Sequence, residues 1–598
     1  MSSLSAKPSR EKEKEVREMY DLKQKVLMYY KENGVPQKME DILNTMYADD
    51  PDDPYGHVAN YFESFSKTPT ITKLLAREAF DSKGQPTVQT EVYCVVKNFE
   101  QLLATATLSS QNWLPDSARQ EDKDTEDAER QEFVTAAVEH VNGSLSAALK
   151  GVDPKNQKEV DQIIYEIIER MRLKEVEERV AKEQELAAQQ EEEQAAALAA
   201  EEANSKGKAK SPPKSPKGKG KAPAVAVIPD EPKEEMYKGS NCLGAVSITV
   251  CQAAAQLKKV ELYEHIASLR FEKMPSKFCV PLPMVTILQS GKAFPGKLNC
   301  VKEFMLVPKP GMPVQEAMRH MTTISNNIAK GLMAKAGIIQ KNVNDLGSLC
   351  PQIDRPEQGL DMLQDAITGL ELTPGEDFHI VLNCGAHEWF DAEKGKYEVI
   401  GGLQKSYEDM VEFWAELLGR YPSVIGLIDP IRQQEKKQWM EICDRLSERC
   451  FIIGENVYSR PGLLKHDELT EEFVSSGVVF RLEQMNQVTD ILDCAKKMEE
   501  AGNQIILSSC QGETSDTQIV DMAVGLNARF IKVGGPSRGE RIAKINRLLQ
   551  LEDNLSKQGK LSPLEPHAFP KISPPPVPEE EEPGSETASQ RSGSGRKK

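Results

Sequence analysis

The stretch QIILSSCQGETSDTQIVDMAVGLNARFIKVGG, residues 504–535, decides the fold class of this chain. It begins and ends with short apolar runs, and a longer segment with the apolar spacing of a helix lies between them. The same alternation extends over about 279–551, with the further apolar runs EFMLVP (303–308), FHIVLNC (378–384), SVIGLID (423–429), CFIIGEN (450–456) and GVVFRL (477–482). This pattern predicts an α/β domain with parallel strands, and it favours a closed barrel and an open doubly wound sheet almost equally.

The composition excludes several classes of protein. The chain of 598 residues is too long for one packed core, which predicts three or four structural units. Its 75 Lys and Arg against 93 Asp and Glu give a net charge of −18, which disfavours general nucleic-acid binding. No apolar run reaches the roughly 18 residues of a membrane helix, and the first 20 residues lack the apolar core of a signal peptide. We therefore expect a cytoplasmic protein without a membrane span, whose 11 cysteines are reduced thiols rather than disulfides or zinc ligands.

The segments that precede the expected barrel differ from one another in composition and in the spacing of their apolar residues. Residues 1–69 hold three short amphipathic helical patterns, and each of them buries little apolar surface alone. From Thr70 onward, the runs ITKLLAREAF and VQTEVYCVVK flank a DSKGQPT turn and predict two strands at the start of an α+β domain over 70–278. The composition of about 173–235 is rich in Glu and Ala and then in Lys and Pro, and it predicts a disordered insertion that is either simply solvated or binds a partner. A disordered tail is expected over 556–598.

Several motifs in register resemble the enolase family. REAFDSKGQPTVQTEV resembles the opening D-S-R-G-N-P-T-V turn, YKGSNCLGAVSITV is similar to a family helix, and GETSDTQIVDMAVGLNARFIKVGGPSRGERIAKINRLLQLEDNL is similar to the C-terminal run. The resemblance covers about 70–170 and 236–555. It implies an enolase-type barrel over 279–555 behind an α+β N-terminal capping domain, in a divergent animal type of the family. It also implies hydro-lyase activity on 2-phosphoglycerate and phosphoenolpyruvate in glycolysis, with Mg²⁺ as cofactor.

The resemblance assigns site residues, of which some are retained. Glu303 in KEFM occupies the position of the Q-E-F-M acid, with a catalytic and substrate-binding role, and Lys532 in FIKVGG occupies that of the lysine that binds the substrate carboxylate. The alternative is that Glu303 serves only in ion pairing and that Lys532 is its structural partner. Arg481 in VVFRLEQ replaces the catalytic base lysine, and an arginine, whose pKa exceeds ~12, is a poor base but still binds phosphate or carboxylate.

The metal ligands and the second acid are replaced. The three metal-binding carboxylates of the family become Asn383, Ile428 and Glu455, which leaves Asn383 and Glu455 as weak candidate ligands. The second essential Glu of G-D-E-G-G becomes Leu346. The phosphate loop S-H-R-S-G-E-T becomes residues 508–514, SSCQGET, without its His and Arg. Mg²⁺ requires hard anionic oxygens at near-octahedral geometry, so these replacements predict impaired metal binding.

The N-terminal segment carries a second resemblance. GVPQKMEDILNTMYADDPDDPYGHVANYFESF is similar to the dimerisation and docking domain of cAMP-dependent kinase regulatory subunits, which binds an amphipathic helix of an A-kinase anchoring protein. The candidate docking positions are Ile42, Leu43, Met46, Pro54, Val58, Ala59, Tyr61 and Phe62. The alternative is a pair of helices packed on the enolase-like body.

The sequence thus leaves two functions open. One is a hydro-lyase with a strongly altered site and weak activity. The other is a catalytically inactive paralogue that forms a homodimer, or a heterodimer with an ordinary enolase, and is anchored as a scaffold in a cytoskeletal structure. For this divergent type the resemblance implies attachment in the sperm flagellum.

Overall fold

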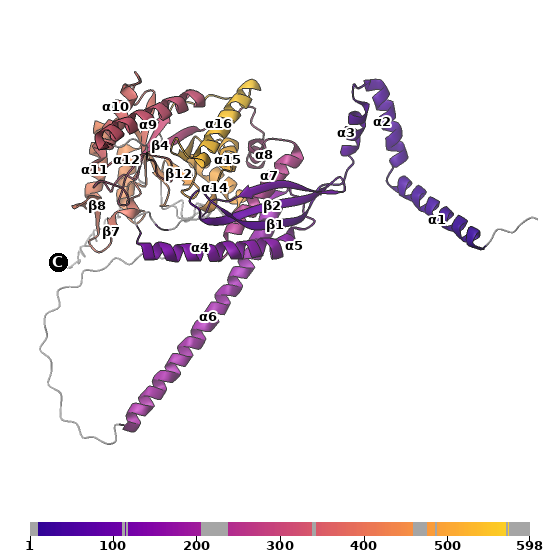
Figure 1. Ribbon diagram of the computed structural model, residues 1–598, viewed down its shortest axis with the longest axis horizontal. Coiled ribbons are helices and arrows are strands. Elements are labelled where there is room, and N and C mark those ends of the chain that lie inside the picture. The colour runs from indigo at the N-terminus through magenta and orange to yellow at the C-terminus, as the bar shows by residue number, and fades with distance from the viewer. Residues whose placement is uncertain are drawn as a thin grey trace, which may run out of the picture. The chain divides into compact units, whose positions relative to one another are not determined.

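The structure is a computed structural model in which residues 10–110, 114, 118–204, 237–337, 342–457, 475–484, 487–569 and 572 are described, with backbone alone at 10–13, 183–204, 336 and 484. The chain divides into two compact units (Figure 1), of which one comprises residues 1–69 with 95–99 and the other the remaining residues. No helix in the described parts is both long enough and apolar enough to cross a membrane. All 11 cysteines are free thiols in the structure.

The N-terminal unit contains the three helices that the sequence predicted, α1 (Arg10–Glu32), α2 (Val35–Asp49) and α3 (Pro54–Glu63). Asp53 caps α3, because its side chain accepts a hydrogen bond from the backbone N–H of Gly56 at 2.9 Å. Pro54 fits the first helical position, because proline has no backbone N–H that would need a hydrogen-bond partner there. Along α2, Ile42 is 1% exposed, whereas Leu43 beside it is 55% exposed. Ile42 was expected on the docking surface, and this expectation is wrong because the side chain is buried within the protein.

The capping domain opens with a three-stranded meander of β1 (Thr70–Phe80), β2 (Pro86–Val96) and β3 (Phe99–Thr107). The first two strands and their turn confirm the prediction. In the turn, the Asp81 carboxylate accepts hydrogen bonds from the backbone N–H groups of Lys83 and Gln85, each at 2.8 Å, and Gly84 adopts φ +72°. The helical elements of this domain are α4 (Gln120–His140), the π-helical turn η1 (Val141–Leu145), α5 (Ser146–Leu149), α6 (Gln157–Asn204), α7 (Asn241–Lys258) and α8 (Leu262–Arg270). Within the expected insertion, α6 continues to Asn204, and residues 205–236 lie outside the described residues.

Within the described ranges, eight strands close into a barrel, which decides between the two predicted α/β architectures. The strands are β4 (Leu282–Gln289), β5 (Glu303–Pro308), β6 (Phe378–Asn383), β10 (Val424–Ile428), β11 (Phe451–Gly454), β12 (Gly477–Phe480), β13 (Gln504–Ser508) and β14 (Phe530–Gly534). Alternate side chains fill the interior with an apolar cluster that includes Met284, Met305, Phe451 and Phe530. The barrel is therefore packed through its centre, and a group of buried polar side chains lies at one mouth.

One strand departs from the predicted parallel arrangement. β5 is antiparallel to both β4 and β6, whereas the other pairs of neighbouring strands are parallel. The connection of residues 290–302 between β4 and β5 contains no helix that would carry the chain back across the sheet, and without such a crossover consecutive neighbours run antiparallel. As a consequence, the first residue of β5, Glu303, lies at the same end of the barrel as the last residues of the parallel strands, as its pairing with Asn383 shows.

The barrel strands are covered by helices (Figure 1). These helices are α9 (Val314–Ala336), α10 (Pro356–Thr368), α11 (Tyr407–Arg420), α12 (Lys436–Leu446), α14 (Val488–Glu500), α15 (Gln518–Gly525) and α16 (Gly539–Lys557). Short elements follow the ends of two strands, namely the 3₁₀ turns η3 (Ala386–Glu388) and η5 (Leu482–Gln484) and the small sheet of β7 (Phe390–Asp391), β8 (Lys396–Ile400) and β9 (Leu403–Lys405).

The C-terminal tail is not disordered over the whole predicted range of 556–598. Helix α16 extends to Lys557, and the residues after it pack on the barrel, where Leu564 and Phe569 contact the interior apolar cluster. The Phe569 ring lies 4.7 Å from that of Phe451, centroid to centroid, and His567 stacks on Phe530 at 5.9 Å. The prediction was wrong here because these few apolar and aromatic side chains gain burial against the open end of the barrel, which composition averaged over the tail conceals.

Candidate functional site

The candidate site is a cavity of about 100 Å³ at one mouth of the barrel. It is lined by residues at the strand ends, among them Glu303 of β5, Asn383 of β6, Glu455 after β11, Arg481 after β12 and Lys532 of β14. The structure therefore brings together the five site residues that the sequence predicted, although up to 229 positions separate them along the chain. Such strand ends are where barrel proteins carry their sites.

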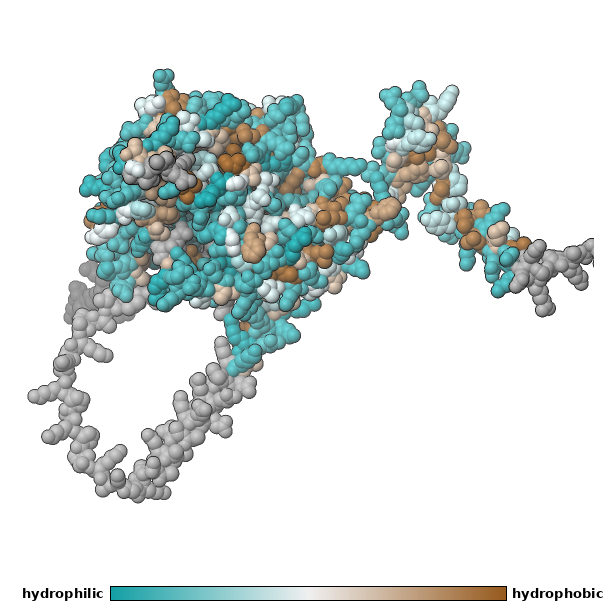
Figure 2. Space-filling view, viewed as in Figure 1, coloured by the Kyte–Doolittle hydropathy of each residue, from teal (hydrophilic) through white to brown (hydrophobic). Residues whose placement is uncertain are grey.

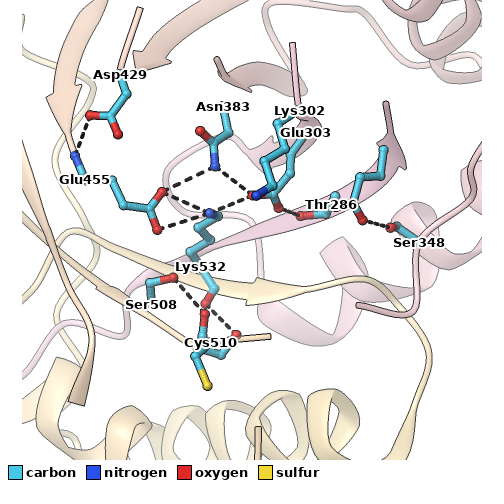
Figure 3. A network of polar contacts seen from close by, with 12 residues as sticks. Thr286, Lys302, Glu303, Ser348, Asn383, Asp429, Glu455, Ser508, Cys510 and Lys532 are labelled. Atoms are coloured by element: carbon cyan, nitrogen blue, oxygen red, sulfur yellow. Dashed lines mark hydrogen bonds and ion pairs between the residues drawn. The ribbon is translucent and has the colours of Figure 1, made fainter. Parts of the chain in front are cut away.

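A buried lysine forms the centre of this site. The Lys532 Nζ atom lies 2.7 Å from Glu303 Oε1 and 3.1 Å from Glu455 Oε2, so one ammonium group is shared by two carboxylates (Figure 3). All three side chains are buried, and each charge is thus balanced by a partner rather than by water. The Thr286 hydroxyl, which sequence reasoning missed, donates a hydrogen bond to Glu303 Oε2 at 2.6 Å.

Asn383 and Arg481 complete the network around the two carboxylates. The Asn383 amide Nδ2 donates to Glu303 Oε1 at 2.7 Å and to Glu455 Oε2 at 3.3 Å. The Arg481 guanidinium Nε lies 3.3 Å from Glu455 Oε1, and its Nη2 atom donates to Asn456 Oδ1 at 2.9 Å. Glu455 therefore faces two cations and an amide donor at once.

These contacts keep all four charged groups ionised. Burial by itself would raise the pKa of Glu303, but the Lys532 charge and the hydrogen bonds from Lys532, Thr286 and Asn383 lower it to about 2. Burial would also raise the pKa of Glu455, but the charges of Lys532 and Arg481 lower it. The two carboxylates in turn raise the pKa of Lys532 against the effect of burial, and Glu455 does the same for Arg481.

The replaced positions are also close to the cavity. Leu346 lines it with a hydrocarbon side chain that can neither donate nor accept a proton. Ile428, the last residue of β10, is fully buried in the apolar interior and pairs in register with Asn383. Asp429 beside it has φ +47° and accepts hydrogen bonds from the backbone N–H groups of Glu455 and Asn456 at 2.8 and 2.7 Å. Asp429 thus positions the loop that carries Glu455, while burial raises its own pKa to about 6.

The loop 508–514 contacts two cationic side chains of α16, Arg541 and Lys544. Arg541 donates to the carbonyl oxygens of Cys510 and Gln511 at 2.7 and 2.9 Å, and Lys544 lies 3.2 Å from the Glu513 carboxylate. The carbonyl oxygens of this loop are therefore engaged by side chains of α16. Sequence reasoning identified the changed residues of the loop but not these partners, which come from another element.

Two further charged features line the cavity and were not predicted. Lys302, next to Glu303, forms an ion pair with Glu388 at 2.6 Å. Glu483 follows Arg481 by two residues in η5 and is also buried at the cavity wall. The available signal for both was a charged residue within two positions of a motif residue.

Glu483 predicts a pH dependence of stability. Burial raises its pKa to about 8 from an ordinary value of 4.5, although Arg481 opposes this shift. Between these two pH values the folded state binds a proton that the unfolded state has lost, so the contribution of Glu483 to stability falls as pH rises from about 5 to 8, by on the order of 5 kcal/mol. Chemical denaturation at pH 5.5, 7.0 and 8.5 should show a smaller loss of unfolding free energy in Glu483→Gln than in the unmodified chain.

The exposed Glu441→Gln is the matched control, and its pH dependence should equal that of the unmodified chain. If Glu483→Gln and Glu441→Gln follow the same curve, Glu483 does not hold an extra proton in the folded state.

The residues present at this mouth do not fit Mg²⁺, the cofactor that the enolase resemblance implies. Both oxygens of Glu455 face cations, Ile428 presents hydrocarbon, and Asp429 is occupied by backbone N–H groups. The Asn383 Oδ1 atom is buried and has no hydrogen-bond partner among the described residues, which makes it an available oxygen, but Mg²⁺ needs about six. In the described parts of the chain, no three or more His, Cys, Asp or Glu side chains are grouped so that they could hold a metal ion.

Comparison with known proteins yields matches over most of the chain. The N-terminal domain of enolase matches residues 71–174, and the C-terminal TIM barrel domain of enolase matches residues 277–565. Enolase 4 of Xenopus laevis is 35% identical over 568 residues, which are 94% of this chain and 96% of the relative. Enolase 4 of Homo sapiens is 33% identical over 572 residues (92% and 91%), and Enolase 4 of Mus musculus is 34% identical over 575 residues (92% of both). These matches agree with the divergent type that the sequence motifs indicated.

Proposed function

This chain belongs to the enolase family, and from that premise we propose that it carries a hydro-lyase site of the 2-phosphoglycerate and phosphoenolpyruvate type that turns over its substrate only weakly. The observation that carries this proposal is the ion-paired cluster in which Lys532 contacts both Glu303 and Glu455. Enolase chemistry requires such charged groups to be free to contact the substrate or a metal ion, whereas Glu303, Glu455 and Lys532 form ion pairs with one another.

The reaction makes specific demands that this site meets in part. A proton must leave the carbon next to a carboxylate, which requires a base of suitable pKa and strong stabilisation of the resulting anion. Arg481, at the position of the base, stays protonated because Glu455 raises its pKa against burial. Leu346 offers no acid for the departure of hydroxide. Lys532 and Arg481 are still suited to bind the carboxylate or phosphate of a substrate, and Glu303 keeps its position beside Lys532.

A turnover assay on the purified chain, free of other enolases and supplied with Mg²⁺, tests this proposal. We expect a rate about 10³-fold or more below that of an ordinary enolase, because the base, the second acid and two metal carboxylates are replaced and each 1.36 kcal/mol of lost transition-state stabilisation lowers the rate tenfold. Glu303→Gln should remove the remaining activity. Ordinary turnover that both a chelator and Glu303→Gln abolish would mean that other residues perform these roles.

A second candidate function is that of an anchored, non-catalytic partner, and the apolar surface of the N-terminal unit favours it. Apolar side chains are exposed on α1 and α2 (Figure 2), and on α2 Met39, Leu43 and Tyr47 recur every four residues on one face. Such a face fits the dimerisation and docking resemblance, with a second copy of this chain and the amphipathic helix of an A-kinase anchoring protein as its occupants. A homodimer or a heterodimer with an ordinary enolase, attached to the cytoskeleton of the sperm flagellum, would be the resulting assembly.

A further inference from the structure

We propose that Lys532 is the fixed counter-ion of Glu303 and Glu455, so that the barrel mouth is neutralised and held together by protein side chains and does not bind Mg²⁺. This inference concerns the charge balance and cohesion of the site. It does not depend on whether the chain turns over a substrate.

The geometry gives Lys532 two partners on different strands. Its Nζ atom lies 2.7 Å from Glu303 Oε1 on β5, and 3.1 and 3.4 Å from the two oxygens of Glu455 after β11. One ammonium group thereby connects β14, β5 and the segment after β11, and all three side chains are almost completely buried. Ion pairs in such a low-dielectric setting are screened far less by salt than surface pairs.

The formal charges of this cluster sum to zero. Glu303 and Glu455 contribute two negative charges, and Lys532 and Arg481 contribute two positive charges within 3.3 Å of them. The neighbouring pair of Lys302 and Glu388 is neutral as well. A divalent cation entering here would meet two carboxylates whose charges are already balanced by Lys532 and Arg481.

The oxygen donors lead to the same conclusion. Glu455 is the remaining acid among the three former metal positions, and its two oxygens already contact Lys532 and Arg481. Coordination of a metal by Glu455 would require both cations to move away, and Ile428 contributes no oxygen that would compensate for this loss. The Asn383 Oδ1 atom, which has no partner in the described part of the chain, is one neutral ligand where several anionic ones are needed.

Melting of the full-length chain, followed by circular dichroism in EDTA and in 10 mM Mg²⁺, tests the proposal. The unmodified chain should melt at the same temperature in both buffers to within about 1 °C, because a ligand that does not bind the folded state does not stabilise it. Lys532→Met should lower the melting temperature in EDTA by ~5 °C or more, since it removes the cation paired with buried Glu303 and leaves Glu455 with Arg481. Mg²⁺ should then recover part of this loss, because the released carboxylates regain a cation.

Lys302→Met is the matched control, since it removes a cavity-lining lysine that is paired with one carboxylate on the less buried side of the site. It should cost less stability than Lys532→Met and show no response to Mg²⁺. The double variant Lys532→Met/Glu303→Gln should melt above Lys532→Met, because removing both partners is less costly than leaving one charge unpaired.

Two results would overturn the proposal. One is a Mg²⁺-induced rise in melting temperature of the unmodified chain that Glu455→Gln abolishes. The other is a Lys532→Met variant that melts like the unmodified chain. If Lys532→Met does not fold, the unmodified chain and Glu455→Gln are instead titrated with Mn²⁺, and binding is followed by electron paramagnetic resonance. Identical titration curves support the proposal. A Mn²⁺ site that is present in the unmodified chain and lost in Glu455→Gln refutes it.

Discussion

Leu346→Glu alone will leave the turnover of 2-phosphoglycerate within tenfold of the unmodified chain. The new carboxyl group would restore the second acid at the cavity wall, where Leu346 now lies. An acid at this position acts on the anion that forms when the substrate loses its proton. That anion is neither formed nor stabilised here, because Arg481 does not take up a proton and Glu455 is engaged by Lys532 and Arg481. The expected result is thus a near-silent substitution at a position that the family resemblance marks as essential.

The combined variant Leu346→Glu/Asn383→Asp/Ile428→Glu/Arg481→Lys should behave differently. It returns the base, both missing metal carboxylates and the second acid, and it frees Glu455 from the guanidinium group. We expect at least a 10²-fold gain in Mg²⁺-dependent turnover over the single variant, because groups that act as a unit contribute far more together than separately. Thermal melting of both variants controls for misfolding, since Ile428 is fully buried in the barrel interior. A gain of more than tenfold from Leu346→Glu alone would show that a metal binds through other ligands.

Leu43→Glu in the full-length chain will weaken the binding of an amphipathic anchoring helix by about 10²-fold or more. Leu43 is 55% exposed and lies between Met39 and Tyr47 on one face of α2. A carboxylate in the middle of this face would have to be desolvated against the apolar side of the partner helix, which costs several kcal/mol. Fluorescence anisotropy of a labelled anchoring helix measures the change.

Thr45→Glu is the matched control for this experiment. Thr45 is exposed on the same helix but lies about 200° around it from Leu43, so its replacement should leave binding unchanged. Ile42 is unsuitable as a probe, because its burial would make Ile42→Glu a test of folding rather than of docking. If the unmodified chain ignores such helices at micromolar concentration, the packing of these helices on the enolase-like body is the preferred explanation.

The sequence predicted local structure well where the signal itself is local. The strand pair around the DSKGQPT turn, the three N-terminal helices and the strands of the barrel follow from apolar spacing and turn residues within about ten positions. The reversed direction of β5 was missed because it depends on how the connection 290–302 crosses the barrel end, which spacing does not encode. The packed segment around Phe569 was missed for a related reason, since its partners Phe451 and Phe530 are distant in sequence.

For the candidate site, the sequence by itself determined which chemical groups are present. It identified Glu303, Asn383, Glu455, Arg481 and Lys532, together with the carboxylates missing at Leu346 and Ile428, because residue identity in a motif is readable one position at a time. Only the tertiary structure decided how these groups are used, since closure of the barrel sets which charges meet. It brings Lys532 within 3.1 Å of two carboxylates that lie 229 and 77 positions earlier, and it separates buried Ile42 from exposed Leu43. Pairing and burial depend on distances in space, which only the folded chain fixes.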